Sequence, residues 1–217
     1  MKRLVIFDLD GTLINTISDL AHCTNHVLLQ NHYPEHELSR YPYFVGNGIT
    51  KLIERALPPE ARTSTIISTV KAQFIAYYHQ HKTDFSHPYP HIPGVLAELK
   101  NKGILLAVAS NKYQAGTTEL VEHFFGKHLF SVIFGQRDQV PVKPDPCIVF
   151  DILKQTGMKP SQTLYIGDSG VDMHTARNGK LTSVGVTWGF RSRQELEENG
   201  ADYIIDQPQQ ILELLSI

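Results

Sequence analysis

Residues 4–13 of the chain read LVIFDLDGTL, a short apolar run that ends in two aspartates, Asp8 and Asp10. The apolar residues stand on consecutive positions and do not alternate with polar ones, which is typical of a strand covered on both faces. Such strands occur in parallel sheets that lie between two layers of helices. The stretch therefore predicts a buried parallel strand, Leu4–Phe7, with two carboxylates just beyond its end.

Similar apolar runs recur along the chain, and helix-like segments separate most of them. They cover Ile104–Ala109, Val132–Phe134, Thr163–Ile166, Ser183–Val186 and Tyr203–Ile205. Pro144 and Pro146 suit the first turn of a helix that ends at Gly157. Gly179 is expected to end a further helix in the left-handed conformation. This alternation predicts an α/β fold with a doubly wound, Rossmann-like parallel sheet and right-handed crossovers.

One region breaks the alternation. From Thr16 to Lys82 the apolar residues recur with helical spacing only, and no strand is expected there. A proline-rich segment, residues 85–94, then leads back to the α/β part as a stiff connector. We therefore expect a discontinuous α/β core, residues 1–15 and 87–217, that is interrupted by a helical insertion at residues 16–86.

The composition limits the possible partners. The 217 residues include 20 Lys and Arg against 22 Asp and Glu, a net charge of -2, which argues against a nucleic-acid partner. No apolar run is long enough for a membrane span or a secretory segment. Only two cysteines are present, so a disulfide framework is not expected. A soluble cytoplasmic protein without a membrane partner fits these observations.

Polar residues follow the ends of four predicted strands. In an open parallel sheet, ligands bind beyond these ends, where the strand order reverses. Each residue alone has an ordinary explanation as a turn, a helix cap or a surface charge. Their joint occurrence predicts one site, and its members are Asp8, Asp10, Ser110, Asn111, Lys112, Lys143, Asp168 and Asp172.

The chemistry that this set indicates is phosphoryl transfer. Clustered aspartates repel one another unless a cation lies among them, and oxygen ligands of this kind suit Mg²⁺. Asp8 and Asp168 are the expected carboxylate ligands, with Asp172 binding directly or through water. Ser110 and Lys143 would contribute a hydrogen bond and a positive charge to the phosphoryl oxygens.

The first two aspartates have different expected roles. A carboxylate can act as a nucleophile and split one difficult step into two easier ones, and Asp8 at the strand end suits that role. Asp10 lies two residues further on and points to the same side, beside the leaving group. It would act as the general acid and then as the general base for the hydrolytic water.

At these residues the chain resembles the haloacid dehalogenase superfamily, in its phosphatase branch. Asp8–Leu13, Ser110, Lys143 and Gly167–Asp172 match its four motifs in order and spacing. The resemblance implies Mg²⁺-dependent hydrolysis of phosphomonoesters through an aspartyl-phosphate on Asp8. It also implies a metal contact from the main-chain carbonyl of Asp10, phosphate contacts from Thr12 and Asn111, and a mobile cap formed by the helical insertion.

Several residues narrow the resemblance further. Phe44–Gly48, Leu52–Leu57, Ser110–Lys112 and Gly185–Gly189 are similar to the phosphoglycolate phosphatases. In the turn formed by Gly46, Asn47 and Gly48, backbone amides can approach an anionic ligand closely. Lys112 and Arg55 are candidates to neutralise a second anionic group of the substrate, whereas Tyr77 and Tyr78 are expected to pack.

Other functions remain open at this point. The same residues would serve a pyrophosphatase, a nucleotide or sugar-phosphate phosphatase, or a phosphomutase. A signalling module that is phosphorylated on Asp8 is a further possibility, although it has no use for Asp10 or a large cap. A binding protein with vestigial residues is less consistent with the complete set of motifs. The expected partner is a small phosphate ester, and the protein is expected to be a monomer or a homodimer.

Overall fold

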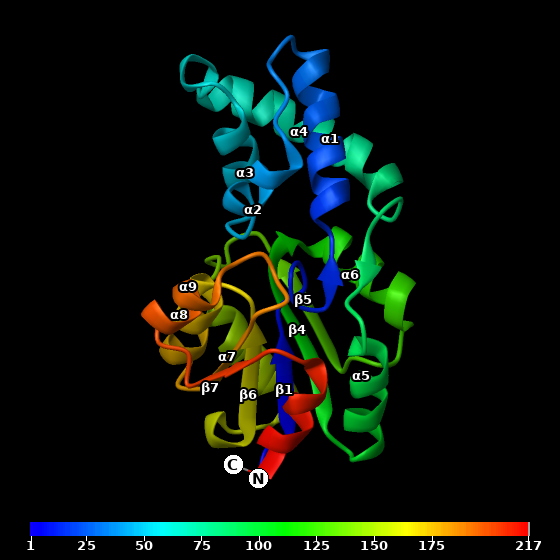
Figure 1. Ribbon diagram of the computed structural model, residues 1–217, viewed down its shortest axis with the longest axis vertical. Helices are drawn as coiled ribbons and strands as arrows, with labels where there is room; N and C mark the ends of the chain where they lie inside the picture. The colour runs from blue at the N-terminus through cyan, green and yellow to red at the C-terminus, as the bar shows by residue number, and fades with distance from the viewer. Residues whose placement is uncertain (217) are drawn as a thin grey trace.

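The structure is a computed structural model that describes residues 1–216; the expected end of the core, Ile217, lies outside the described residues. Its centre is a six-stranded sheet with the order β5-β4-β1-β6-β7-β8, in which every neighbouring pair is parallel (Figure 1). The strands are β1 (Leu4–Phe7), β4 (Leu105–Tyr113), β5 (Val132–Gln136), β6 (Thr163–Gly167), β7 (Thr182–Val186) and β8 (Tyr203–Ile205). The predicted doubly wound parallel sheet is confirmed.

Apolar side chains cover both faces of the sheet, as the unbroken apolar runs predict. Val5 and Phe7 of β1 pack into one core cluster, and Leu4 and Ile6 pack into another. The first face is covered by α5 (Ile92–Asn101), α6 (Gln114–Phe125) and the 3-10 helix η4 (Pro208–Ser216). The second is covered by α7 (Cys147–Thr156) and α8 (Gly170–Asn178), while α9 (Arg193–Glu198) packs beside β7 and β8. A 3-10 turn, η3 (Pro160–Gln162), precedes β6.

The strand order reverses at β1. From β1 the chain continues to β4 and β5 on one side, and it then returns to β6, β7 and β8 on the other side. The carboxyl ends of β4, β1 and β6 therefore lie next to one another at the point where a doubly wound sheet binds its ligands. The residues at the ends of these three strands are therefore close together, because the strands themselves are neighbours in the sheet.

A separate helical part, residues 17–81, stands over this edge of the sheet (Figure 1). It consists of α1 (Ile17–Gln30), α2 (Tyr41–Phe44), α3 (Ile49–Ala56) and α4 (Ser64–His81), with the short 3-10 helices η1 (Leu38–Arg40) and η2 (Pro59–Ala61). Its buried residues, among them Val27, Ile53 and Phe74, form a core cluster distinct from those of the sheet. The predicted helices are present, and the exact domain boundaries stay a prediction.

Two short strands connect the helical part to the sheet. β2 (Ile14–Asn15) leads out and β3 (His87–Pro88) leads back, and the two pair as an antiparallel ribbon. Beside them, the buried carboxylate of Asp19 in α1 accepts hydrogen bonds from the backbone N–H groups of Phe85 at 2.9 Å and Ser86 at 2.8 Å. One side chain of the helical part thus holds the returning chain.

The structure differs from the sequence expectation at three places. β4 continues through Ser110–Lys112 to Tyr113, which pairs with Gln136, and its register with β5 shifts between Ala109 and Tyr113. The stiff connector contains two elements that were not expected there, the strand β3 and the first turn of α5. The expectation that Gly179 is left-handed was wrong: its φ is -79°, and Lys180 adopts the left-handed conformation with φ of 57°.

Within residues 1–216, no helix combines the length and the apolar character that crossing a membrane requires.

Candidate active site

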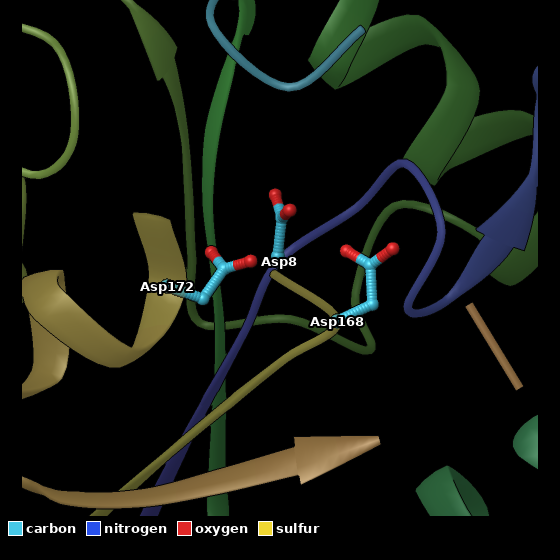
Figure 2. A group of neighbouring side chains, drawn as sticks. All are labelled: Asp8, Asp168 and Asp172. Carbon is cyan, nitrogen blue, oxygen red and sulfur yellow. The ribbon is translucent and has the colours of Figure 1, made fainter. Parts of the chain in front are cut away.

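Three carboxyl groups face the same space at the carboxyl edge of the sheet. Asp8 follows β1, Asp168 follows β6, and Asp172 lies in the first turn of α8 (Figure 2). One carboxylate oxygen from each of them lies within 4.8 Å of the other two. Residues that are far apart in the sequence therefore form one acidic cluster, as their positions after neighbouring strands predict.

The turn after β1 packs directly on Asp168. Gly11 has a φ of 87°, and a Cβ atom there would lie 2.4 Å from Oδ2 of Asp168. Only glycine both adopts this backbone conformation readily and leaves room for the carboxylate. Oδ2 of Asp168 also accepts a hydrogen bond from the backbone N–H of Phe190 at 2.7 Å, so its orientation is fixed from two sides.

Lys143 connects two of the three carboxylates. Its buried ammonium lies 2.9 Å from Oδ1 of Asp8 and 2.8 Å from Oδ1 of Asp172, and it donates to the carbonyl of Ala109 at 2.9 Å. The other oxygen of Asp172 accepts hydrogen bonds from the backbone and hydroxyl of Ser169. Asp172 is thus held by protein groups on both oxygens.

The negative charge of the cluster exceeds the single positive charge of Lys143. Burial, and then the charge of Asp172, raise the pKa of Asp8 to about 7, although Lys143 acts in the opposite direction. Burial and the same neighbouring charges raise the pKa of Asp168 well above its usual range. Burial opposes the charge of Lys143, but Asp172 and Asp8 outweigh it and raise its pKa. A cation between Asp8 and Asp168 would relieve this repulsion, and one or two carboxylates, completed by waters and substrate phosphate, are the oxygen ligands that Mg²⁺ usually takes.

Asn111 uses its whole side-chain amide on the protein. Its Oδ1 accepts the backbone N–H of Lys143 at 2.8 Å, and its Nδ2 donates to the carbonyls of Lys143 at 3.1 Å and Gly46 at 3.0 Å. The side chain therefore fixes the backbone of Lys143 and contacts the helical part. The expected phosphate contact of Asn111 stays a prediction, and this side-chain amide is already engaged.

Asp10 and Lys112 form a second ion pair at the site. The ammonium of Lys112 lies 3.2 Å from each carboxylate oxygen of Asp10, and Oδ1 of Asp10 also accepts the hydroxyl of Thr16 at 2.8 Å. The same ammonium lies 4.7 Å from the centre of the Tyr78 ring in α4. The charge of Lys112, which we expected to meet a second anionic group of the substrate, is directed to Asp10.

A pocket lies between the sheet edge and the helical part. The sheet contributes acidic and polar residues to its wall, and the helical part contributes mainly apolar ones. Its wall consists of Asp8, Asp10, Leu20, Val45, Gly46, Gly48, Ile49, Leu52, Phe74, Tyr78, Ser110, Asn111, Lys112, Tyr113, Asp168, Ser169, Phe190 and Arg191. Of the predicted turn, Gly46 and Gly48 thus reach the pocket.

Five residues that were expected to bind the substrate or the metal do not belong to this wall: Thr12, Asn47, Arg55, Lys143 and Asp172. Of these, Lys143 and Asp172 belong to the acidic cluster described above. The guanidinium of Arg55 donates to the carbonyl of Phe44 at 3.1 Å and to Oδ1 of Asn47 at 2.8 Å. The side chains of Arg55 and Asn47 thus stabilise the turn and do not line the pocket. Thr12 is fully buried, and its carbonyl accepts the indole N–H of Trp188 at 3.0 Å. The structure gives no support to substrate contacts by the Arg55 and Asn47 side chains.

The sequence reasoning missed Arg191 and underestimated Tyr78. Arg191 follows β7 and donates to the carbonyls of Pro42 and Val45 in the helical part, the latter at 3.1 Å. The rule that polar residues at strand ends reach the site would have included it, had it been applied to β7. Tyr78 carries no comparable signal, because only the packing of α4 over the sheet edge brings it to the pocket.

Comparisons with known proteins agree with this geometry. A family model described as "haloacid dehalogenase-like hydrolase" matches residues 5–186. A phosphoglycolate phosphatase of Pasteurella multocida (strain Pm70) is 33% identical over 98% of this chain and 98% of its own length. One from Haemophilus influenzae (strain 86-028NP) is 32% identical with the same coverage.

A solved structure supports the same conclusion. A predicted phosphoglycolate phosphatase from Haemophilus somnus 129PT superimposes with a TM-score of 0.90 and 29% identity, covering 98% of this chain and 97% of that one. The resemblance stated from the motifs is thereby confirmed, and so is the expectation of a hydrolase. From its motifs, its fold and these relatives, the chain belongs to the haloacid dehalogenase-like hydrolases.

Proposed function

We propose that the protein is a Mg²⁺-dependent phosphatase that hydrolyses a small phosphate monoester, foremost phosphoglycolate, through an aspartyl-phosphate on Asp8. The observation that carries this proposal is the cluster of Asp8, Asp168 and Asp172 within 4.8 Å, with Lys143 joined to two of them. Phosphoryl transfer depends on positioning and on stabilising charge, and this cluster provides both.

The residues suit a magnesium ion. Asp8 and Asp168 would hold it, together with the main-chain carbonyl of Asp10, and Asp172 would support them because both of its oxygens already bind protein groups. The ion would supply positive charge for the phosphoryl oxygens and for the crowded carboxylates. This assignment agrees with the raised pKa values of Asp8 and Asp168, which are caused by burial and then by the neighbouring negative charges that a bound cation would offset.

Asp8 is the proposed nucleophile. Its Oδ1 accepts the backbone N–H of Leu9 at 2.7 Å and the ammonium of Lys143, whereas Oδ2 has no hydrogen-bond partner within residues 1–216. Oδ2 would attack phosphorus as the ester bond breaks, which transfers the phosphoryl group to Asp8. Asp10 would give its proton to the departing oxygen of the leaving group.

The second step restores the enzyme. Asp10, now a carboxylate, would take a proton from a water molecule that attacks the phosphorus of the aspartyl-phosphate. The bond between phosphorus and Oδ2 of Asp8 then breaks, and inorganic phosphate leaves. Lys143 and Ser110 would bind the phosphoryl oxygens throughout, with Thr12 and Asn111 as further expected contacts at the same edge.

The helical part would act as a cap during these steps. It supplies one wall of the pocket, and it contacts the sheet edge through Gly46, which bonds to Asn111, and Val45, which bonds to Arg191. Closure would exclude water while the phosphoryl group is transferred, and opening would release the product. The relatives named phosphoglycolate phosphatase support phosphoglycolate as the first substrate to test.

The test is release of inorganic phosphate from phosphoglycolate and from p-nitrophenyl phosphate. We expect turnover with Mg²⁺ and none with EDTA, and Asp8→Asn should lower kcat by at least about 10⁴-fold because it removes the nucleophile. Asp151→Asn is the matched control, since Asp151 lies on α7 and pairs with Arg137 away from the pocket. It should leave kcat unchanged.

Retention of a few per cent of activity in Asp8→Asn would contradict covalent catalysis by this residue. A panel that also contains pyrophosphate, a nucleotide and a sugar phosphate separates the alternatives within the family. Stable phosphorylation of Asp8 without turnover would instead indicate a signalling module.

A further inference from the structure

Two tyrosine hydroxyls at the pocket have no protein partner. Tyr78 in α4 is fully buried, and Tyr113 lies at the end of β4. Both residues belong to the pocket wall, and both hydroxyl oxygens are buried without a hydrogen-bond partner within residues 1–216. Buried hydroxyls of this kind are rare, because an unmade hydrogen bond costs free energy. Each therefore needs an explanation.

The surroundings of these hydroxyls are charged on one side and apolar on the other. The ring of Tyr78 lies 4.7 Å from the ammonium of Lys112, which is itself paired with Asp10. Burial raises the pKa of Tyr78 and of Tyr113, so both hydroxyls keep their protons at neutral pH and are available as donors. The ring of Tyr78 thus lies near the carboxylate that would protonate the leaving group, whereas the ring of Tyr113 packs on Gly116 of α6 at the same pocket.

The remaining wall of the helical part offers no comparable donor side chain. Its side chains are apolar at Leu20, Ile49, Leu52 and Phe74. Arg191 already donates to backbone carbonyls of the helical part. Besides the backbone N–H groups of the turn at Gly46 and Gly48, the free donors that an oxygen of the leaving group would meet on this side, within residues 1–216, are the two tyrosine hydroxyls.

We propose that the hydroxyls of Tyr78 and Tyr113 recognise the leaving group by donating hydrogen bonds to its carboxylate. The preferred substrates are accordingly short phosphate esters that carry a carboxylate close to the ester oxygen. This inference rests on the proposed phosphatase function and adds the residues that select the substrate. The sequence context of Tyr78 predicted packing alone, and this inference adds a binding role.

The test compares two esters that differ only in the group concerned. The leaving groups of phosphoglycolate and ethyl phosphate both contain two carbons. They differ in one group, because ethyl phosphate carries a methyl group where phosphoglycolate carries the carboxylate. Tyr78→Phe and Tyr113→Phe each remove one hydroxyl and keep the ring. For each variant with Mg²⁺, we expect kcat/KM for phosphoglycolate to fall about tenfold, mainly through KM, the effect of one lost hydrogen bond to a charged oxygen. kcat/KM for ethyl phosphate should change by less than about twofold.

Tyr41→Phe is the matched control within the helical part. Tyr41 is also fully buried, but its hydroxyl donates to Oδ1 of Asn25 at 2.5 Å and it does not belong to the pocket wall. The control should keep the wild-type ratio of the two substrates and lower the melting temperature by about 3 °C, because Oδ1 of Asn25 loses one of its two donors and keeps only the backbone N–H of His36. Tyr78→Phe should not lower the melting temperature, since its hydroxyl has no protein partner to lose.

The possible outcomes separate this inference from the proposed function. If the wild-type protein hydrolyses both esters and neither tyrosine variant changes their ratio, the hydroxyls do not select the substrate and the inference is overturned. A wild-type preference for ethyl phosphate over phosphoglycolate would overturn it as well. If no phosphate ester is hydrolysed at all, the proposed function fails, and the inference fails with it.

Discussion

The carboxyl group of Asp8 is buried beside two other acidic side chains, and its pKa in the metal-free protein is raised to about 7. In the unfolded chain the same group titrates near its ordinary value of 3.8. Between these two values the folded protein binds more protons than the unfolded chain, so the free energy of unfolding falls as the pH rises. The stabilising contribution of the protonated group is complete below about pH 4 and is lost by about pH 7.

This behaviour can be measured by urea unfolding in EDTA at several values of pH between about 4.5 and 7.5. We expect a smaller decline in stability for Asp8→Asn, which cannot ionise at this position. Mg²⁺ should stabilise the wild-type protein most at the upper end of the range, where the carboxylates are charged. Equal pH slopes for the two proteins would show that Asp8 is not the group responsible.

At the scale of single residues, the strand-end rule was sufficient to predict which side chains gather at the sheet edge. Asp8 and Asp168 follow β1 and β6, and Ser110 lies in the last part of β4; because these strands are neighbours in the sheet, the proximity of the three residues follows from the fold class. The partners of Lys112 and Arg55 did not follow in this way. Their long side chains reach whichever acceptor the tertiary packing places nearby, and neither periodicity nor spacing encodes that acceptor.

At the scale of elements, the end of α8 shows how packing can decide the place of a glycine. A Cβ atom on Gly179 would lie 2.8 Å from Cγ1 of Val149 in α7, so the glycine allows two helices to approach each other. The left-handed turn falls one residue later, on Lys180. The sequence pattern Asn-Gly correctly indicates the end of a helix. It does not show whether the glycine is needed for a left-handed backbone conformation or for close packing against a neighbouring helix.

Lys180→Gly should therefore stabilise the protein, because a residue with a Cβ atom is strained in the left-handed conformation. We expect a gain of about 0.5–1 kcal/mol in the free energy of unfolding, after the greater freedom of glycine in the unfolded chain is allowed for. Lys154→Gly, the same exchange at an exposed position inside α7, should cost about 1 kcal/mol. A loss of stability in Lys180→Gly would refute the explanation by strain.

Strands and helices were predictable to different degrees. The apolar runs of the sequence predict the bounds of β1, β6 and β8 to within one residue, because strands buried on both faces consist of consecutive apolar residues. β2 and β3 were not predicted, since each contains two residues and depends on its partner. The extension of β4 through Ser110–Lys112 was missed as well, because polar residues in a strand resemble the start of a loop.

At the scale of the whole molecule, the chain passes between the sheet and the helical part at the ribbon of β2 and β3. β2 and β3 pair side by side, and the buried carboxylate of Asp19 binds the backbone of Phe85 and Ser86. These hydrogen bonds hold the outgoing and returning segments together, and Asn111 and Arg191 add contacts from the sheet edge to the helical part.

Asp19→Ala should weaken this connection, because it leaves two backbone N–H groups without their acceptor. We expect a loss of about 2–3 kcal/mol in the free energy of unfolding and a fall of several-fold in kcat/KM for every substrate alike. Because kcat/KM should fall equally for all substrates, this effect differs from that of Tyr78→Phe, which should lower kcat/KM for phosphoglycolate alone. Asp84→Ala removes an exposed carboxylate close by, which pairs with His81, and should cost no more than about 0.5 kcal/mol. Wild-type stability in Asp19→Ala would contradict the proposed anchoring.

The ribbon of β2 and β3 has a consequence for how such proteins diversify. The chain leaves the sheet at Asn15 and returns at His87, which is the residue paired with it. An insertion of any length or shape can start and finish at two points that adjoin, and the order of the six parallel strands is unaffected. Descendants of one ancestor can thus exchange the helical insertion and inherit the acidic cluster at the sheet edge unchanged.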